Sequence, residues 1–202
     1  MGRPGFRGIT LLGMRLFVGI PLADAAAREL AAAVARMRSR ESVARSGGLR
    51  WTAPESWHIT LQFLGNATAE QLECLRARLG EVRSAAVPVQ LGELGCFDRA
   101  GVFFASVNVT PGLAALQQHV TAATNLCGFV AEVRPFHPHI TLARAKGQGR
   151  GSGLRELAAR AGKGPAFTRF LAGEFVLYES HLEADGARYE AKARVALKDG
   201  GQ

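Results

Sequence analysis

The sequence contains two copies of one short phrase, WHITL at 57–61 and PHITL at 138–142. In each copy a His and a Thr stand two residues apart within an apolar run that contains β-branched residues, a pattern typical of a β-strand. Side chains alternate faces along a strand, so the His and Thr of one copy share a face while its Ile and Leu point into a core. The four polar residues are His58, Thr60, His139 and Thr141.

Two imidazoles and two hydroxyls from matching strands predict a phosphodiester site that works without a metal. Displacement at phosphorus needs a base for the nucleophile and an acid for the leaving oxygen, and histidine suits both roles because its ordinary pKa is ~6.5. The threonine hydroxyls can donate hydrogen bonds to the non-bridging oxygens. A 2′,3′-cyclic phosphate is a suitable target because its five-membered ring is strained. The residues alone leave open which histidine is the acid.

Zinc is the alternative explanation for paired histidines, because imidazole is its usual nitrogen ligand. A catalytic zinc site needs a third protein ligand, and the sequence offers neither HxxxH nor HExxH spacing. His137 lies two residues before His139, but Pro138 disturbs the strand between them. We therefore expect catalysis with no metal and no cofactor.

We expect opposite placements for the two residues that follow the first motif. In a regular strand Gln62 shares the face of His58 and Thr60, which makes it a candidate for contact with substrate, although plain strand filler is an equal alternative. Phe63 is out of phase with the histidine, so we expect it in the core.

Three more residues near the second motif are candidates for substrate binding. Arg144 is one residue out of phase with His139, so its contact with a phosphate requires a β-bulge or a strand end. Arg134 is a weaker candidate for the same role. Phe136 is a candidate for stacking on a nucleobase, but the sequence does not distinguish it among eleven phenylalanines.

The order of elements repeats along the chain. Strands are expected at 14–20, from His58 to 65–66, at 89–97, 102–109 and 129–134, at the His139 motif, and at 167–171, 174–180 and 187–197. Helices are expected from Asp24, from a capping box at 68–71, from Thr110-Pro111 to Cys127, and at 154–161. The repeat predicts two similar α+β lobes across a pseudo-twofold axis, with both motifs lining the groove between them.

Length and composition fit one domain. The chain has 202 residues and is 48% hydrophobic, enough for one compact domain or two small lobes. We expect a single bilobal domain at 14–198 after a flexible extension at 1–13, with Met14 as a candidate natural start. No apolar run reaches the roughly 18 residues that a membrane-spanning helix needs. Without an amphipathic heptad repeat, a monomer is the default expectation.

Cysteine count and charge give weaker indications. Three cysteines, Cys74, Cys96 and Cys127, form no CxxC pair, which favours a reducing compartment, the cytoplasm, with buried thiols and neither disulfides nor a zinc cluster. The formal net charge is +8, from 25 basic and 17 acidic residues. A basic surface attracts polyanions such as RNA, but scattered arginines are equally a matter of composition.

The paired HxTL motifs resemble those of the two-histidine phosphoesterase superfamily. Several segments are similar to its bacterial RNA 2′,3′-cyclic phosphodiesterase branch, the LigT-like proteins once described as 2′–5′ RNA ligases. They are MRLFVGIPL at 14–22, RWTAPESWHITLQFLG at 50–65, RPFHPHITLAR at 134–144 and VLYESHLEADGARYE at 176–190. The resemblance runs from Met14 to about Leu197.

This resemblance implies a bilobal α+β fold and hydrolysis of an RNA 2′,3′-cyclic phosphate to a 2′-phosphomonoester. By analogy His58 protonates the leaving 3′ oxygen, His139 activates water, and Thr60 and Thr141 hold the phosphate. The sequence departs from the family in two places. Residues 1–13 have no counterpart, and the position of Gln62 often carries a basic residue in the family.

The motifs leave other activities open. The same site is compatible with 2′,5′-linked oligonucleotides, with small cyclic nucleotides, or with reverse 2′–5′ ligation of RNA. In a different class of function, the chain binds RNA ends without turning them over.

Overall fold

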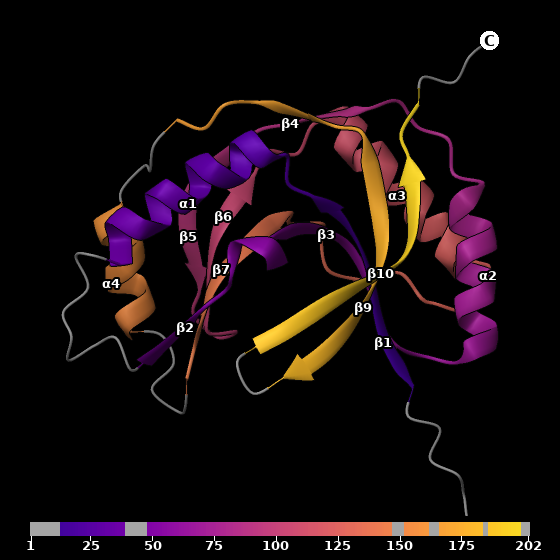
Figure 1. Ribbon diagram of the computed structural model, residues 1–202, viewed down its shortest axis with the longest axis horizontal. Helices are drawn as coiled ribbons and strands as arrows, with labels where there is room; N and C mark the ends of the chain where they lie inside the picture. Colours follow the sequence, from indigo (N-terminus) through magenta and orange to yellow (C-terminus); the bar gives the residue numbers. More distant parts are fainter. Residues whose placement is uncertain (1–12, 39–47, 147–151, 162–165, 184–185, 199–202) are drawn as a thin grey trace, which may run out of the picture.

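The computed structural model describes residues 13–38, 48–146, 152–161, 166–183 and 186–198. Of the flexible extension expected at 1–13, only Gly13 lies within these ranges. The described chain forms two four-stranded antiparallel sheets and one small two-stranded sheet, with helices at both ends (Figure 1).

Each of the two large sheets contains one of the two motifs. The first sheet has the spatial order β10 (Gly186–Ala196), β9 (Glu174–Glu183), β1 (Met14–Pro21) and β3 (His58–Ala67). The second has the order β2 (Leu49–Trp51), β7 (His139–Ala145), β6 (Val102–Val107) and β5 (Leu91–Phe97). The small sheet pairs β4 (Val87–Val89) with β8 (Phe170–Ala172). The motifs thus begin β3 and β7, as the sequence predicts.

Four α-helices and a short 3-10 turn complete the described part of the fold. They are α1 (Asp24–Arg38), η2 (Pro54–Ser56), α2 (Ala69–Gly80), α3 (Pro111–Asn125) and α4 (Ser152–Ala161). The predicted capping box is confirmed, since Thr68 accepts from the Gln71 backbone N–H and the Gln71 side chain accepts from the Thr68 N–H. Thr110 likewise caps α3 ahead of Pro111. None of the described helices combines the length and the apolar character needed to cross a membrane.

The helices cover the outer ends of a bilobal molecule. Figure 1 shows α1 and α4 at one end and α2 and α3 at the other, with the two large sheets between them. Helix α4 packs on β5 and β6, whereas α3 packs on α2 and on β3. The motif strands β3 and β7 lie next to each other where the sheets meet. The predicted α+β bilobal fold with the motifs at the junction is therefore confirmed.

Both motif strands bulge at the leucine of the motif. In the β1–β3 pair, Gly19 lies opposite Thr60 and Val18 lies opposite Gln62, so Leu61 is an extra residue. In the β6–β7 pair, Leu142 is the extra residue by the same shift of register. A bulge moves the following side chains by one position and reverses their faces relative to a regular strand.

The strand predicted at 129–134 is wrong. The described backbone there is irregular and has no β-partner, and Val130 and Val133 are 87% and 99% exposed. Its β-branched residues have strand propensity, but no neighbouring strand and no core surface are available to them.

The expectation of unpaired thiols is also wrong, because Cys74 and Cys127 form a disulfide. Cys74 lies on α2 and Cys127 follows the end of α3, and the packing of these two helices brings them together. The partners are 53 residues apart, so local spacing gave no sign of the pair. Cys96 is the free cysteine within the described chain. Cysteine usage therefore no longer supports a reducing compartment.

We predict that dithiothreitol lowers the stability of the oxidised protein, because a cross-link across a loop of this length restricts the unfolded chain and contributes about 2–4 kcal/mol. The measurement is the free energy of unfolding in urea with and without reductant. Cys74→Ala should abolish the dependence on reductant, and Cys96→Ala should retain it. Equal stability of the reduced and oxidised wild type would contradict the prediction.

Candidate active site

The two motif histidines have the same hydrogen-bonding arrangement. Nδ1 of His58 lies 2.9 Å from the carbonyl oxygen of Ser56, and Nδ1 of His139 lies 2.8 Å from that of His137. A carbonyl can only accept, so each Nδ1 carries a proton and donates it. In a neutral ring the lone pair is then on Nε2. Each imidazole is thereby prepared to take or give a proton at Nε2.

Aromatic rings enclose His58 on the first sheet. Its ring centroid lies 4.5 Å from that of Phe17, and Tyr189 meets it edge-on at 5.0 Å. Gly19 lies beside the imidazole, and a Cβ at this position would meet the Ile59 carbonyl oxygen at 3.1 Å and Cδ2 of His58 at 3.3 Å. A side chain on Gly19 would press on the ring, so glycine leaves the space that His58 needs.

His139 has an equivalent surrounding on the second sheet. Phe97 and Phe104 contact its imidazole at centroid distances of 5.1 and 5.5 Å, and they stack on each other at 4.2 Å. The two histidines are half-buried, and both are close enough to interact electrostatically, since the charge of His139 acts on His58. The structure thus brings the two imidazoles into one site.

Burial holds both imidazoles in their neutral form. The pKa of His58 is lowered to about 4, chiefly by burial and also by the charges of His139 and Arg144, while the hydrogen bond to Ser56 acts in the opposite direction. Burial is also the largest cause of the lowered pKa of His139. The surroundings therefore favour an anion between the two rings, because negative charge would offset the repulsion.

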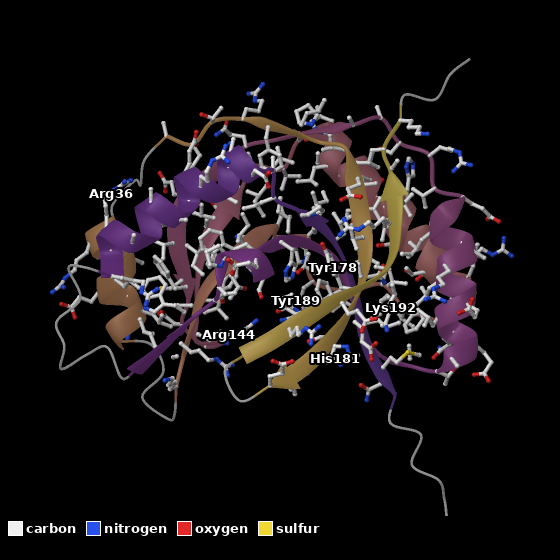
Figure 2. The ribbon with its side chains drawn as sticks, viewed as in Figure 1. Arg36, Arg144, Tyr178, His181, Tyr189 and Lys192 are labelled. Carbon is white, nitrogen blue, oxygen red and sulfur yellow. A yellow bond between two sulfur atoms is a disulfide. The ribbon has the colours of Figure 1, made fainter. Side chains whose placement is uncertain are left out.

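Arg144 reaches this site because of the bulge in β7. The extra Leu142 buries Ala143 and leaves Arg144 exposed on the face of His139 and Thr141. Its positive charge contributes to the lowered pKa of both motif histidines. Figure 2 shows Arg144 beside Tyr189, where the second sheet approaches the β9–β10 hairpin.

The bulge in β3 reverses the expected placements of Gln62 and Phe63. Gln62 is buried on the opposite face, where its Oε1 accepts a 2.7 Å hydrogen bond from Thr124 of α3, so its predicted contact with substrate is wrong. Phe63, predicted in the core, is 60% exposed. It pairs across the strands with Phe17, and their rings are 6.3 Å apart, which places it on the face of His58.

The two weaker candidates lie apart from this set of contacts. Arg134 is exposed and forms an ion pair with Glu132. Phe136 is half-buried and packs against the hydrophobic core. Within the described chain, Phe136 does not stack on a motif histidine and the charge of Arg134 does not shift the pKa of one. Their roles in binding stay predictions.

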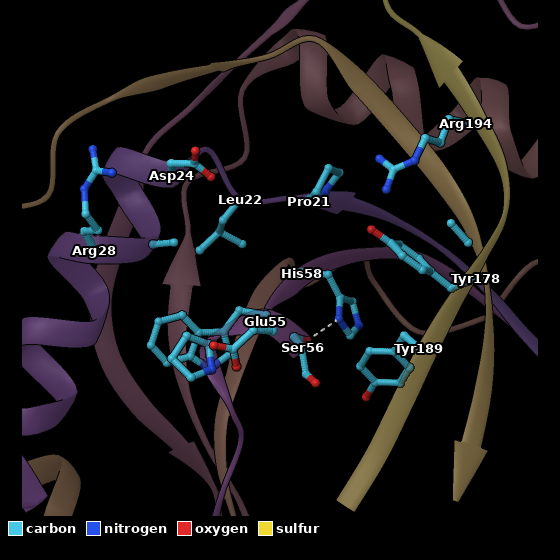
Figure 3. A pocket seen from close by; sticks show the side chains of 14 residues that line it. Pro21, Leu22, Asp24, Arg28, Glu55, Ser56, His58, Tyr178, Tyr189 and Arg194 are labelled. Atoms are coloured by element: carbon cyan, nitrogen blue, oxygen red, sulfur yellow. Dashed lines mark hydrogen bonds between the residues drawn. The ribbon is translucent and has the colours of Figure 1, made fainter.

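A pocket of about 540 Å³ adjoins His58 (Figure 3). Its polar lining includes Asp24, Arg28, Glu55, Tyr178, Tyr189 and Arg194. Figure 3 shows the His58 imidazole between Ser56 and Tyr189, with the hydrogen bond to Ser56 along the pocket wall. The pocket provides open space on one side of the ring.

The group best suited to hold a metal ion in the described chain lies elsewhere. Ligand atoms of Glu179, His181 and Glu190 are within 4.8 Å of one another on the β9–β10 hairpin. Lys192 already pairs with both carboxylates, at 2.7 and 2.9 Å. Glu179 lies opposite Leu16 and points away from the face of Tyr178, so this group is on the other side of the sheet from His58.

Comparison with known proteins shows the family of this chain. The family model of the 2′-5′ RNA ligase superfamily matches residues 22–183. The chain belongs to this superfamily. It is 31% identical over 146 residues to the RNA 2′,3′-cyclic phosphodiesterase of Bacillus subtilis, covering 70% of this chain and 76% of that protein. It is 32% identical over 193 residues to the enzyme of the same name from Geobacillus stearothermophilus, covering 90% of this chain and 56% of that protein.

The structure is similar to that of Escherichia coli LigT in complex with 3′-AMP, with a TM-score of 0.71 and 26% identity. The superposition covers 92% of this chain and 98% of LigT. The predicted membership of this family is therefore confirmed.

Sequence reasoning missed the aromatic surroundings of the histidines. Phe17, Tyr178 and Tyr189 all face His58 but come from three different strands. No alternation of polar and apolar residues marked Phe17 in the sequence, because every residue of β1 from Leu16 to Ile20 is buried. The two tyrosines lie in the segment similar to the family, but only strand pairing places them beside the motif.

We predict that the imidazole of His58 titrates near pH 4 in the free protein and that orthophosphate raises its midpoint. Burial disfavours the charged ring, and a bound anion favours it. Two-dimensional NMR of the histidine side chains, followed over pH with and without phosphate, measures both effects. The signal of His119, exposed on α3, is the internal control and should not respond to phosphate. A His58 midpoint at or above 6.5 in the free protein would contradict the prediction.

Proposed function

We propose that this protein hydrolyses the 2′,3′-cyclic phosphodiester at RNA ends to a 2′-phosphomonoester, with His58 and His139 as an acid–base pair and without a metal. The supporting observation is the pair of imidazoles from two matching strands, each with Nδ1 fixed by a carbonyl and with no hydrogen bond at Nε2 from the residues that the structure describes. Membership of the 2′-5′ RNA ligase superfamily and the names of its relatives support the same reaction.

The reaction needs two proton transfers, one from the attacking water and one to the leaving 3′ oxygen. His139 takes a proton from water at Nε2 as the oxygen attacks phosphorus, and His58 gives its proton to the 3′ oxygen as the P–O bond to it breaks. The ring opens, the phosphate remains on the 2′ oxygen, and the enzyme is left with the proton on the other histidine. This assignment of acid and base follows the resemblance to the family.

Hydrogen-bond donors from both motifs hold the phosphate. Thr60 and Thr141 share the faces of His58 and His139, and their hydroxyls can donate to the non-bridging oxygens. Arg144 adds a cation on the same face. As charge moves onto these oxygens in the transition state, all three donors stabilise it more than they stabilise the ground state.

Binding of the anionic substrate sets the protonation state of the two histidines. In the free protein burial keeps His58 neutral at pH 7, and a phosphodiester bound between the rings raises the pKa of the imidazole that must act as the acid. His139, with its lowered pKa, is available as a base. Substrate binding and proton uptake are therefore coupled in this mechanism.

We expect an RNA oligonucleotide ending in a 2′,3′-cyclic phosphate to be converted to the 2′-phosphate in the presence of EDTA. His58→Ala or His139→Ala should lower kcat by about 100-fold or more, because each removes one proton transfer worth 10²–10⁴ in rate. Phosphorus NMR identifies the product, and circular dichroism checks that the variants fold. Loss of activity with EDTA and its recovery with zinc would contradict a mechanism without metal.

Tight binding of the same oligonucleotide, recovered unchanged, would instead indicate a protein that binds RNA ends. Turnover of a 2′,5′-linked oligonucleotide or of a small cyclic nucleotide in place of the RNA end would indicate the alternative substrates.

The pH dependence should differ between kcat/KM and kcat. The first reports the free enzyme, in which both histidine pKa values are lowered, so its bell-shaped optimum should lie below pH 6.5. The second reports the complex, in which the bound anion raises these pKa values, so its optimum should move to higher pH. Initial rates between pH 4 and 9 measure both curves. Profiles that are flat between pH 5 and 8 would contradict the acid–base pair.

A further inference from the structure

We infer that Thr124 of α3 is a positioning residue for the motif strand β3, and that the Cys74–Cys127 disulfide keeps it in place. Reduction of this disulfide by a small thiol such as glutathione therefore lowers the activity of the folded protein. The inference rests on the proposed function, because that function supplies the activity that changes. It goes beyond that function, since neither Thr124 nor the disulfide takes part in the proton transfers.

A hydrogen bond joins the last turn of α3 to the bulge in β3. Thr124 is fully buried, and its hydroxyl donates to Oε1 of Gln62 at 2.7 Å. Gln62 directly follows Leu61, the extra residue of the bulge, and Thr60 precedes that leucine. Within the described chain Nε2 of Gln62 has no hydrogen-bond partner. Loss of the Thr124 contact would thus leave a buried amide unpaired, which is costly unless the strand shifts.

The disulfide secures the same end of α3. Cys127 lies three residues after Thr124, and its backbone N–H donates to the Thr124 carbonyl oxygen at 2.9 Å. Phe129 is buried, but the next residues, 130–135, are exposed and form no β-strand. The chain beyond Phe129 therefore does little to hold the helix end. The covalent bond to Cys74 on α2 is its firmest attachment.

Helix α2, the other partner of the disulfide, is attached to the opposite side of the His58 ring. Nε of Arg76 on this helix donates to the carbonyl oxygen of Lys192 on β10 at 3.2 Å. Tyr189 lies on the same strand (Figure 2), and its ring meets that of His58 edge-on at 5.0 Å. The disulfide thus joins two helices that contact β3 and β10, the strands of His58 and Tyr189. A change in the spacing of these helices acts on both rings.

The second lobe has a different support behind its motif strand. Ala143 occupies in β7 the position that Gln62 occupies in β3, after the same extra leucine. Its methyl group is fully buried and needs no hydrogen bond. Helix α4, which covers this lobe, packs on β5 and β6. Reduction of the disulfide therefore changes the surroundings of His58 and leaves those of His139 unchanged.

A thiolate can reach this disulfide from the side of Cys74, which is half-buried, whereas Cys127 is 8% exposed. The glutathione thiolate attacks Sγ of Cys74, the S–S bond breaks, and Sγ of Cys127 leaves as a thiolate that takes up a proton. A second glutathione thiolate attacks the glutathione sulfur of the mixed disulfide and releases Cys74, which is also protonated. Two electrons pass to the protein, and two glutathione molecules become glutathione disulfide.

The kinetic test equilibrates the protein with mixtures of reduced and oxidised glutathione and measures hydrolysis of an RNA oligonucleotide that ends in a 2′,3′-cyclic phosphate. Full reduction should lower kcat about tenfold with little change in KM, because a small displacement of an acid or base slows the chemical step. Reoxidation should restore the rate. Cys74→Ala should match the reduced wild type under all conditions, and Cys96→Ala should respond as the wild type does.

NMR of the histidine side chains separates positioning from general loosening. On reduction the titration midpoint of His58 should rise by about one pH unit, because a less buried imidazole is protonated more easily. The midpoint of His139 should not move. Thr124→Val, which removes the hydroxyl at similar volume, should give the kcat and the His58 midpoint of the reduced protein while the disulfide is intact. Reduction should then add little to its effect, and Thr124→Ser should retain most of the activity.

Three outcomes would overturn the inference. The first is an unchanged kcat and His58 midpoint in the fully reduced protein, and the second is an equal shift of both histidine midpoints. The third is loss of the native circular dichroism on reduction, because the change is expected within the folded protein. An oxidised wild type that hydrolyses no cyclic phosphate would instead overturn the proposed function, while the His58 midpoint would still decide whether the disulfide acts on the motif strand.

Discussion

The site depends on one constraint: each motif strand must bury its aliphatic residues in a core while the leucine of its motif is an extra residue relative to the partner strand. Ile59 and Leu61 are buried on one side of β3, which forces His58 and Thr60 to the other. The extra leucine then buries a second consecutive residue and reverses the alternation. Without this bulge Phe63 would enter the core, and without its counterpart in β7 Arg144 would turn away from the histidines.

The same packing sets the chemistry of the histidines. Aromatic rings on both sheets partly bury the imidazoles, and the carbonyls of Ser56 and His137 fix their orientation at Nδ1. Burial favours the neutral form of both imidazoles, so a positive charge on either ring is unfavourable in the free protein. In the proposed reaction, an anionic phosphodiester offsets this unfavourable charge, which links substrate binding to the protonation of the acid.

The two lobes repeat the same motif, but the site between them is not symmetric. The motif side chains repeat between the lobes, but the positions after the bulge differ, with Phe63 in one lobe and Arg144 in the other. The same position of the repeat therefore carries an exposed aromatic ring in one lobe and an exposed guanidinium in the other.

Local sequence pattern was enough to predict the two motif strands and the capping box of α2. It also predicted that His58 shares a face with Thr60 and that His139 shares a face with Thr141. These features follow from alternation and from hydrogen bonding within a few residues. The same pattern identified Arg144 only on condition of a bulge. Packing between distant elements set the burial of Gln62, the exposure of Phe63, the aromatic rings around His58 and the Cys74–Cys127 disulfide. Each of these depends on which distant strand or helix lies alongside, and on its register, which a local pattern does not contain.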